Sequence, residues 1–121
     1  MITEASLEKI PSSDEALIEG FVEDCKLRNL TPRTVQEYVG CLRIISEILQ
    51  GFGSSLTGLD NRDVLKRLLA YLLRNRNVSF KTLGNYFSAL STFCDYMVYE
   101  EMANRNPIPP FRKRFIRQLG Y

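Results

Sequence analysis

Apolar side chains recur at intervals of three and four residues through four successive stretches of the chain, and short polar segments separate these stretches. Such spacing predicts amphipathic helices. The helices are expected at about 13–28, 32–50, 61–74 and 79–102. No stretch alternates convincingly at a period of two and no hairpin signal is present, so the pattern predicts an all-α bundle of four to five helices.

Residues that commonly cap helices stand at the start of each stretch. Ser12 and Glu15 have the spacing of a capping box. Thr31 precedes a proline, which is well tolerated at the first helical position. Asp60 and Ser79 are expected to cap the third and fourth helices. The glycine-rich segment 51–58 lacks the spacing of a phosphate-binding loop and is predicted to be a flexible connector.

The fourth stretch has two different faces. An apolar stripe holds Leu83, Phe87, Leu90, Phe93 or Cys94, and Met97. The opposite face is small, polar and free of acid, and it consists of Lys81, Asn85, Ser88 and Thr92 beside Gly84. This polar face, expected beside the start of the second helix, could lie against a large anion. The third stretch carries a broader apolar band and is predicted to be central to the core.

The two ends of the chain differ from its middle. Residues 1–12 carry few structural signals and are predicted to be a loose lead-in. The segment ending in Asn106 and Pro107 breaks the helical pattern. In residues 111–121, Phe111, Phe115 and Leu119 alternate with basic side chains. These residues are expected to form a short amphipathic helix or a basic linker toward a further domain, and residues 13–110 are expected to form the folded domain.

Charge is distributed unevenly along the 121 residues, although the net charge is only +2. Residues 1–60 hold five Lys and Arg against ten Asp and Glu, whereas residues 61–121 hold eleven against four. No acid occurs between Val64 and Cys94. A one-sided field of this kind favours a polyanion as partner, with a merely solvated basic face as the alternative.

The composition argues against several classes of function. The absence of histidine removes the commonest general base and the commonest metal ligand. Cys25, Cys41 and Cys94 lack metal-ligand spacing and are predicted to be reduced core thiols of a cytoplasmic protein. No secretory signal or membrane span is evident. We therefore expect no enzyme active site, no metal and no cofactor in this chain.

Four segments in order resemble the N-terminal core-binding domain of tyrosine recombinases, the family of phage integrases. They are NLTPRTVQEY at 29–38, LDNRDV at 59–64, VSFKTLGNYFSALSTFCDY at 78–96 and NP at 106–107. The likeness covers about residues 13–110. It implies a SAM-like orthogonal helical bundle that forms half of a clamp around double-stranded DNA. It also implies that a separate C-terminal domain cuts the DNA, and that this domain and sister recombinase subunits are partners.

The resemblance implies DNA contacts at the start of the second helix and along the fourth. The implied residues are Thr31, Arg33 and Thr34, then Ser79, Lys81, Thr82, Asn85 and Ser88, with Arg43 and Tyr86 as further contacts. Asn85 is suited to the edge of an adenine, or it is an ordinary solvated helix residue. The family's catalytic tyrosine belongs to the other domain, so Tyr121 is not expected to be a nucleophile.

The sequence departs from the family pattern at Val39 and Gly40, where an arginine is frequent, and at Gly84 and Tyr86. The DNA face is therefore expected to be less basic than usual. The alternative function is a helical protein–protein interaction module, which would dock through the acidic first helix and the 111–119 segment.

Overall fold

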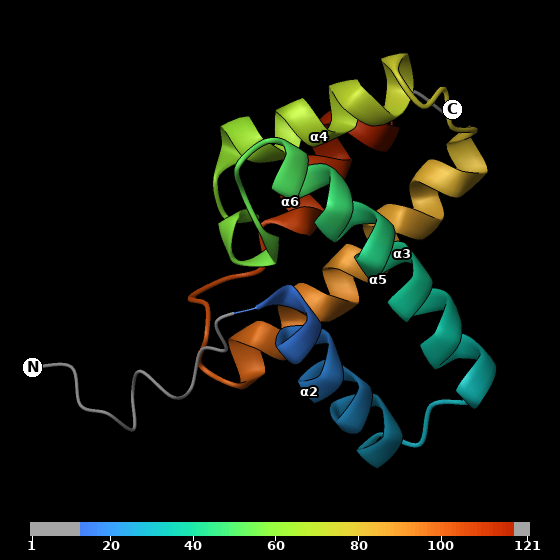
Figure 1. Ribbon diagram of the computed structural model, residues 1–121, viewed down its shortest axis with the longest axis vertical. Helices are drawn as coiled ribbons and strands as arrows, with labels where there is room; N and C mark the ends of the chain where they lie inside the picture. Colours follow the sequence, from blue (N-terminus) through green and yellow to red (C-terminus); the bar gives the residue numbers. More distant parts are fainter. Residues whose placement is uncertain (1–12, 118–121) are drawn as a thin grey trace, which may run out of the picture.

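The computed structural model describes residues 13–117, and all regular structure within them is helical (Figure 1). The helices are α2 (Asp14–Leu27), α3 (Pro32–Gly51), α4 (Arg62–Arg74), α5 (Phe80–Tyr99) and the short α6 (Ile108–Phe111). A 3-10 turn, η1 (Leu56–Gly58), precedes α4, and a π-helical turn, η2 (Arg112–Ile116), continues α6. The all-α prediction is confirmed.

Two of the four predicted N-caps are confirmed and two are wrong by one residue. Thr31 and Ser79 cap α3 and α5 as expected. The side chain of Ser13 accepts the capping bond of α2, and Ser12 lies outside the described residues. Asn61 caps α4 in place of Asp60, because η1 and the turn after it delay the start of the helix by one residue.

α5 ends at Tyr99, earlier than the predicted end at Met102. Glu101 adopts a left-handed conformation with φ of 61°. The N–H of Met102 then bonds the carbonyl of Met97 at 2.8 Å, and the N–H of Glu101 bonds that of Val98 at 3.0 Å. This is a Schellman motif, which usually has glycine at the left-handed position. A glutamate there gives no sign in the sequence that the helix stops.

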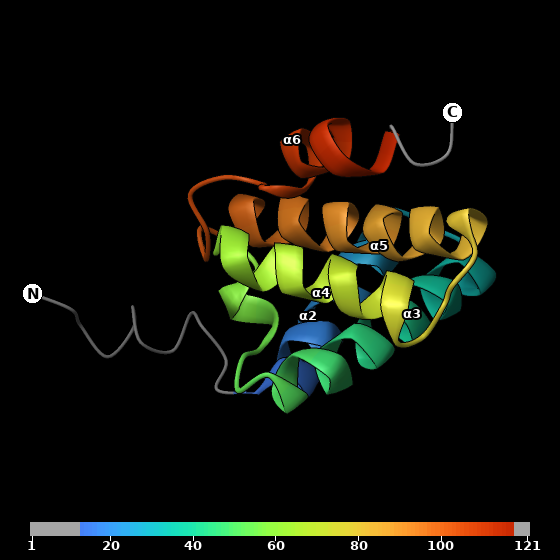
Figure 2. The same ribbon diagram turned by 90° about the horizontal axis from the view of Figure 1, so that it is seen from above.

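The central element of the fold is α5, whereas the sequence pattern predicted α4. α5 buries nine residues and α4 buries four. α5 packs on α2 and α3 on one side, and the C-terminal segment 108–117, formed by α6 and η2, covers another side (Figure 2). The rings of Phe21, Phe93 and Tyr96 meet edge to face where α2 contacts α5. α4 contributes buried leucines from one face only.

The connector between α3 and α4 is anchored rather than flexible. Leu56 is buried, and its N–H donates to both carboxylate oxygens of Asp14 at 3.1 and 3.2 Å. The hydroxyl of Ser46 on α3 donates to the same carboxylate. Asp14, itself buried, therefore ties the first turn of α2 to α3 and to η1, and the predicted flexible loop is wrong.

The C-terminal segment is part of the folded body. Phe111 is buried and its ring stacks on Phe87 of α5, with centroids 5.6 Å apart. The side-chain amide of Asn106 donates to the carbonyl of Ser91 at 2.9 Å and to the carboxylate of Asp95 at 2.8 Å. Packing thus extends past residue 110, where the sequence pattern placed the start of a linker. Leu119 and Tyr121 lie outside the described residues.

Candidate nucleic-acid interface

The polar face of α5 is open to solvent over its first half. Lys81 and Asn85 are exposed, and Ser88 and Thr92 are half-buried. Gly84 lies beside them, and a Cβ placed there would meet no atom within 4 Å. Within the described part of the chain, no acid forms an ion pair with Lys81. Its ammonium group is therefore available to a ligand.

The N-terminal ends of α3 and α5 are built in the same way. The hydroxyl of Ser79 accepts the N–H of Thr82 at 3.1 Å and donates to its hydroxyl at 3.0 Å. Thr31 makes the same two contacts with Thr34, at 3.3 and 2.9 Å. These hydroxyls lie at the surface, at the positive ends of two helix dipoles. Exposed N–H groups and hydroxyls at such ends suit phosphate oxygens.

The two predicted arginines differ in their availability. The side chain of Arg33 is 90% exposed and is 3.5 Å from Glu37, an exposed ion pair that is easily exchanged for a phosphate. Arg43 instead donates from two nitrogens to the two carboxylate oxygens of Glu15 on α2. That hydrogen bonding lowers the pKa of Glu15 and raises the pKa of Arg43. Arg43 thus joins α3 to α2.

The structure removes Tyr86 from the candidate interface. Only 7% of Tyr86 is exposed, and its side chain belongs to the hydrophobic core. Position 86 lies about 140° around the helix from Lys81, on the buried side. Ser88 remains at the surface edge, where its hydroxyl accepts a hydrogen bond from Arg112 at 3.3 Å. The C-terminal segment therefore borders the polar face of α5.

α3 and α5 cross, so the two predicted contact regions are not adjacent. In Figure 1 the N-terminal end of α5 lies at the upper right of the molecule, and the N-terminal end of α3 lies at the lower right. The expectation that the polar face of α5 lies beside the start of α3 is wrong. Thr31, Arg33 and Thr34 form one exposed cluster. Ser79, Lys81, Thr82, Asn85 and Ser88 form the other.

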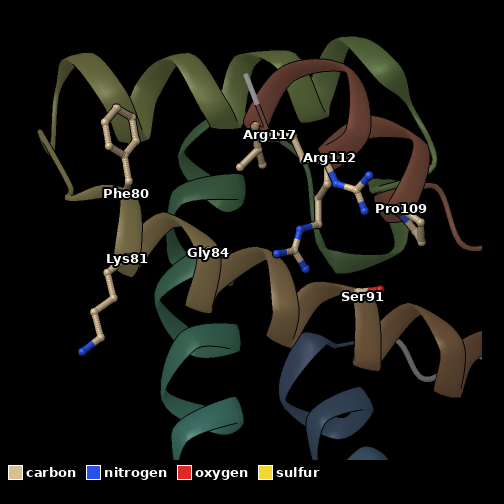
Figure 3. A pocket seen from close by; sticks show the side chains of 8 residues that line it. Phe80, Lys81, Gly84, Ser91, Pro109, Arg112 and Arg117 are labelled. Atoms are coloured by element: carbon tan, nitrogen blue, oxygen red, sulfur yellow. The ribbon is translucent and has the colours of Figure 1, made fainter. Parts of the chain in front are cut away.

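A groove that the sequence pattern did not reveal runs between α5 and the C-terminal segment (Figure 3). Its volume is about 700 Å³. We call it the basic groove, since its lining includes three cationic side chains and no acid. The lining residues are Phe80, Lys81, Gly84, Ser91, Pro109, Arg112, Ile116 and Arg117. It forms because the C-terminal segment folds back over α5.

The described residues offer little catalytic chemistry. Burial raises the pKa of all three thiols, that of Cys94 to about 12, so they are poor nucleophiles near neutral pH. No group of three His, Cys, Asp or Glu side chains within residues 13–117 could hold a metal ion. None of the described helices is both long and apolar enough to cross a membrane.

Comparison with known families gives one match. The family described as phage integrase, N-terminal SAM-like domain, matches residues 17–104. This range spans α2 to α5 and includes both exposed clusters of predicted contact residues. Neither the curated proteins nor the solved structures that we compared gave a match. Since the matched range covers most of the 121 residues and the fold is all-α as expected, the chain belongs to the phage integrase N-terminal SAM-like domain family.

Proposed function

We propose that this chain is the core-binding domain of a site-specific recombinase and that it clamps double-stranded DNA. The observation that carries the proposal is the polar face of α5. Lys81 is unpaired among the described residues, Asn85 is exposed, and the flanking residues are small and uncharged. Such a face permits close approach of a phosphate backbone. Family membership supports the same reading.

The two clusters have complementary roles in this proposal. Lys81 and Arg33 neutralise phosphates, and the hydroxyls of Ser79 and Thr31 add hydrogen bonds at the helix ends. Asn85 stands one helical turn beyond Lys81, where its amide can pair with the edge of an adenine in the major groove. Because the clusters are separated by the crossing of α3 and α5, we propose that they contact successive parts of the backbone.

The proposal assigns cleavage and rejoining of DNA strands to a separate C-terminal catalytic domain. The chain itself holds the substrate and carries out no chemical step. Its partners are then double-stranded DNA, that catalytic domain and sister recombinase subunits, and its location is the cytoplasm, where the three thiols stay reduced.

The test is a titration of labelled duplex DNA by fluorescence anisotropy at several salt concentrations. Each phosphate contact contributes about −0.9 to the slope of log affinity against log salt. We expect Lys81→Ala together with Arg33→Ala to reduce the magnitude of that slope by about 2. Lys26→Ala, which removes one positive charge from the acidic helix α2, is the control and should leave the slope unchanged.

Two results would contradict the proposal. One is the absence of duplex binding at low salt, and the other is a double variant that binds like the unmodified chain. Self-association that is insensitive to salt, measured by light scattering, would instead support a protein-interaction module. The C-terminal segment offers little to such a module, since Phe111 is buried within the chain and Phe115 packs against the core.

A further inference from the structure

We infer that the basic groove binds an unpaired segment of a DNA strand, with the ring of Phe80 stacking on a base. This inference rests on the proposed function, and it adds a second mode of DNA binding in a groove that adjoins the polar face of α5 and shares Lys81 and Gly84 with it. The groove lies between the first turns of α5 and the C-terminal segment (Figure 3).

Phe80 is exposed to solvent. Its side chain stands in the first turn of α5, where 56% of the residue is exposed to solvent, unlike most aromatic side chains of the chain. An exposed aromatic ring is common, but this one lines a groove together with cations. Aromatic rings beside a positive groove are the usual means of binding single strands, because every base has a face that can stack.

The lining of the basic groove is positively charged. Arg112 and Arg117 line the groove from the C-terminal segment, and Lys81 borders it on α5 with its side chain extending away from that segment (Figure 3). Arg112 donates one hydrogen bond to the hydroxyl of Ser88. Because a guanidinium has five N–H donors, most of its donors remain available to a ligand. The lining contains no carboxylate. Two arginines on one wall, a lysine at the border of the other and no acid in the lining suit the phosphates on either side of a stacked base.

The basic groove has the size of a ligand-binding pocket. A volume of about 700 Å³ lies within the range of pockets that enclose small ligands, about 300–1,000 Å³. Open space above Gly84 leaves the floor of the groove free. A duplex is too wide to enter such a groove, and its bases are stacked within it and cannot meet Phe80. An unpaired segment offers a base face and flexible phosphates together.

The test compares two probes on the full chain by fluorescence anisotropy. One is a labelled single strand of about 12 nucleotides, within the range of known single-strand site sizes, and the other is a duplex of equal length. Phe80→Ala should weaken single-strand binding by about 5- to 150-fold and duplex binding by less than about 2-fold, and Phe80→Tyr should restore the single-strand affinity. Arg117→Gln should lower the single-strand salt slope by about 0.7.

Gly84→Leu provides an independent test, because the added side chain enters the groove without meeting an existing atom near its Cβ. We expect it to abolish single-strand binding while the circular dichroism spectrum stays unchanged. Equal loss of single-strand and duplex affinity in Phe80→Ala, or single-strand binding that survives Gly84→Leu, would overturn the inference.

The single-strand and duplex probes distinguish failure of this inference from failure of the proposed function. If the single strand does not bind but the duplex binds through Arg33 and Asn85, the groove inference alone fails. If neither probe binds, both fail.

Discussion

Gly20, Gly40 and Gly84 lie in the interiors of helices, and their surroundings predict substitution effects of opposite sign. Gly40 on α3 and Gly84 on α5 have open space where a Cβ would stand. Gly20 on α2 faces the hydroxyl of Tyr96, and a Cβ there would overlap that oxygen. Alanine should therefore stabilise the chain at Gly40 and Gly84 and should not stabilise it at Gly20.

The magnitude follows from helix propensity and from packing. Alanine is favoured over glycine in a helix interior by about 0.8–1.0 kcal/mol, so Gly40→Ala and Gly84→Ala should each raise the free energy of unfolding by about 1 kcal/mol. For a chain of this length that corresponds to about 4 °C in melting temperature. Gly20→Ala gains the same propensity but pays an overpacking cost of about 1–3 kcal/mol, since the phenol ring of Tyr96 is stiff and only 8% of the residue is exposed.

The assay is urea denaturation followed by circular dichroism at neutral pH, with a double-mutant cycle at the clash. Tyr96→Phe removes the hydroxyl and leaves the ring carbon at 3.5 Å from the added Cβ, an ordinary contact. In that background Gly20→Ala should recover its gain of about 1 kcal/mol. Additive effects of Gly20→Ala and Tyr96→Phe would refute the reasoning, as would destabilisation by Gly84→Ala.

Two further predictions concern buried groups. Asp14→Ala should lower the free energy of unfolding by about 3 kcal/mol, because the N–H of Leu56 loses its acceptor. Urea denaturation measures this loss, with Glu23→Ala on the surface of α2 as the control. A loss of less than about 1 kcal/mol in Asp14→Ala would contradict the prediction. Burial, with smaller contributions from nearby acids, raises the pKa of Cys94 from 9.0 to about 12, so the folded state disfavours the thiolate. The stability that this thiol contributes is complete below about pH 9 and is lost as pH rises toward 12, by about 1 kcal/mol between about pH 8 and pH 10. Urea denaturation of Cys94→Ala under reducing conditions should therefore show a free energy of unfolding that falls by about 1 kcal/mol less over this pH range. An equal fall in the variant and the unmodified chain would contradict the raised pKa of Cys94.

The sequence was sufficient for the helices because their signals are local. The spacing of apolar residues, the caps Thr31 and Ser79, and the break before Pro107 each act within one or two turns. The errors occurred where an ordinary residue took an uncommon conformation, as at Glu101, or where a preceding turn shifted a start, as at Asn61. Neither leaves a distinctive residue type in the sequence.

The candidate site was harder to predict because it depends on contacts between distant segments. The helical period places Lys81 and Asn85 on one exposed face, and the same period should have placed Tyr86 on the buried side. By contrast, nothing within the first helix or the second indicates that Arg43 and Glu15 form an ion pair across 28 positions. An arginine on an exposed helix face looks available until its tertiary partner is known.

The basic groove depends on two such distant relations. The 108–117 segment must fold back on α5. The stacking of Phe111 on Phe87 and the hydrogen bond from Asn106 to Ser91 hold it there. Only then do Arg112 and Arg117 line the same groove as Lys81. The segment that the sequence pattern assigned to a linker thus serves as one wall of a surface whose other wall is the helix at the centre of the fold. Because the packing that holds this wall uses Phe111 whereas the groove exposes Phe80, the stability of the fold and the capacity to bind a strand can be varied separately.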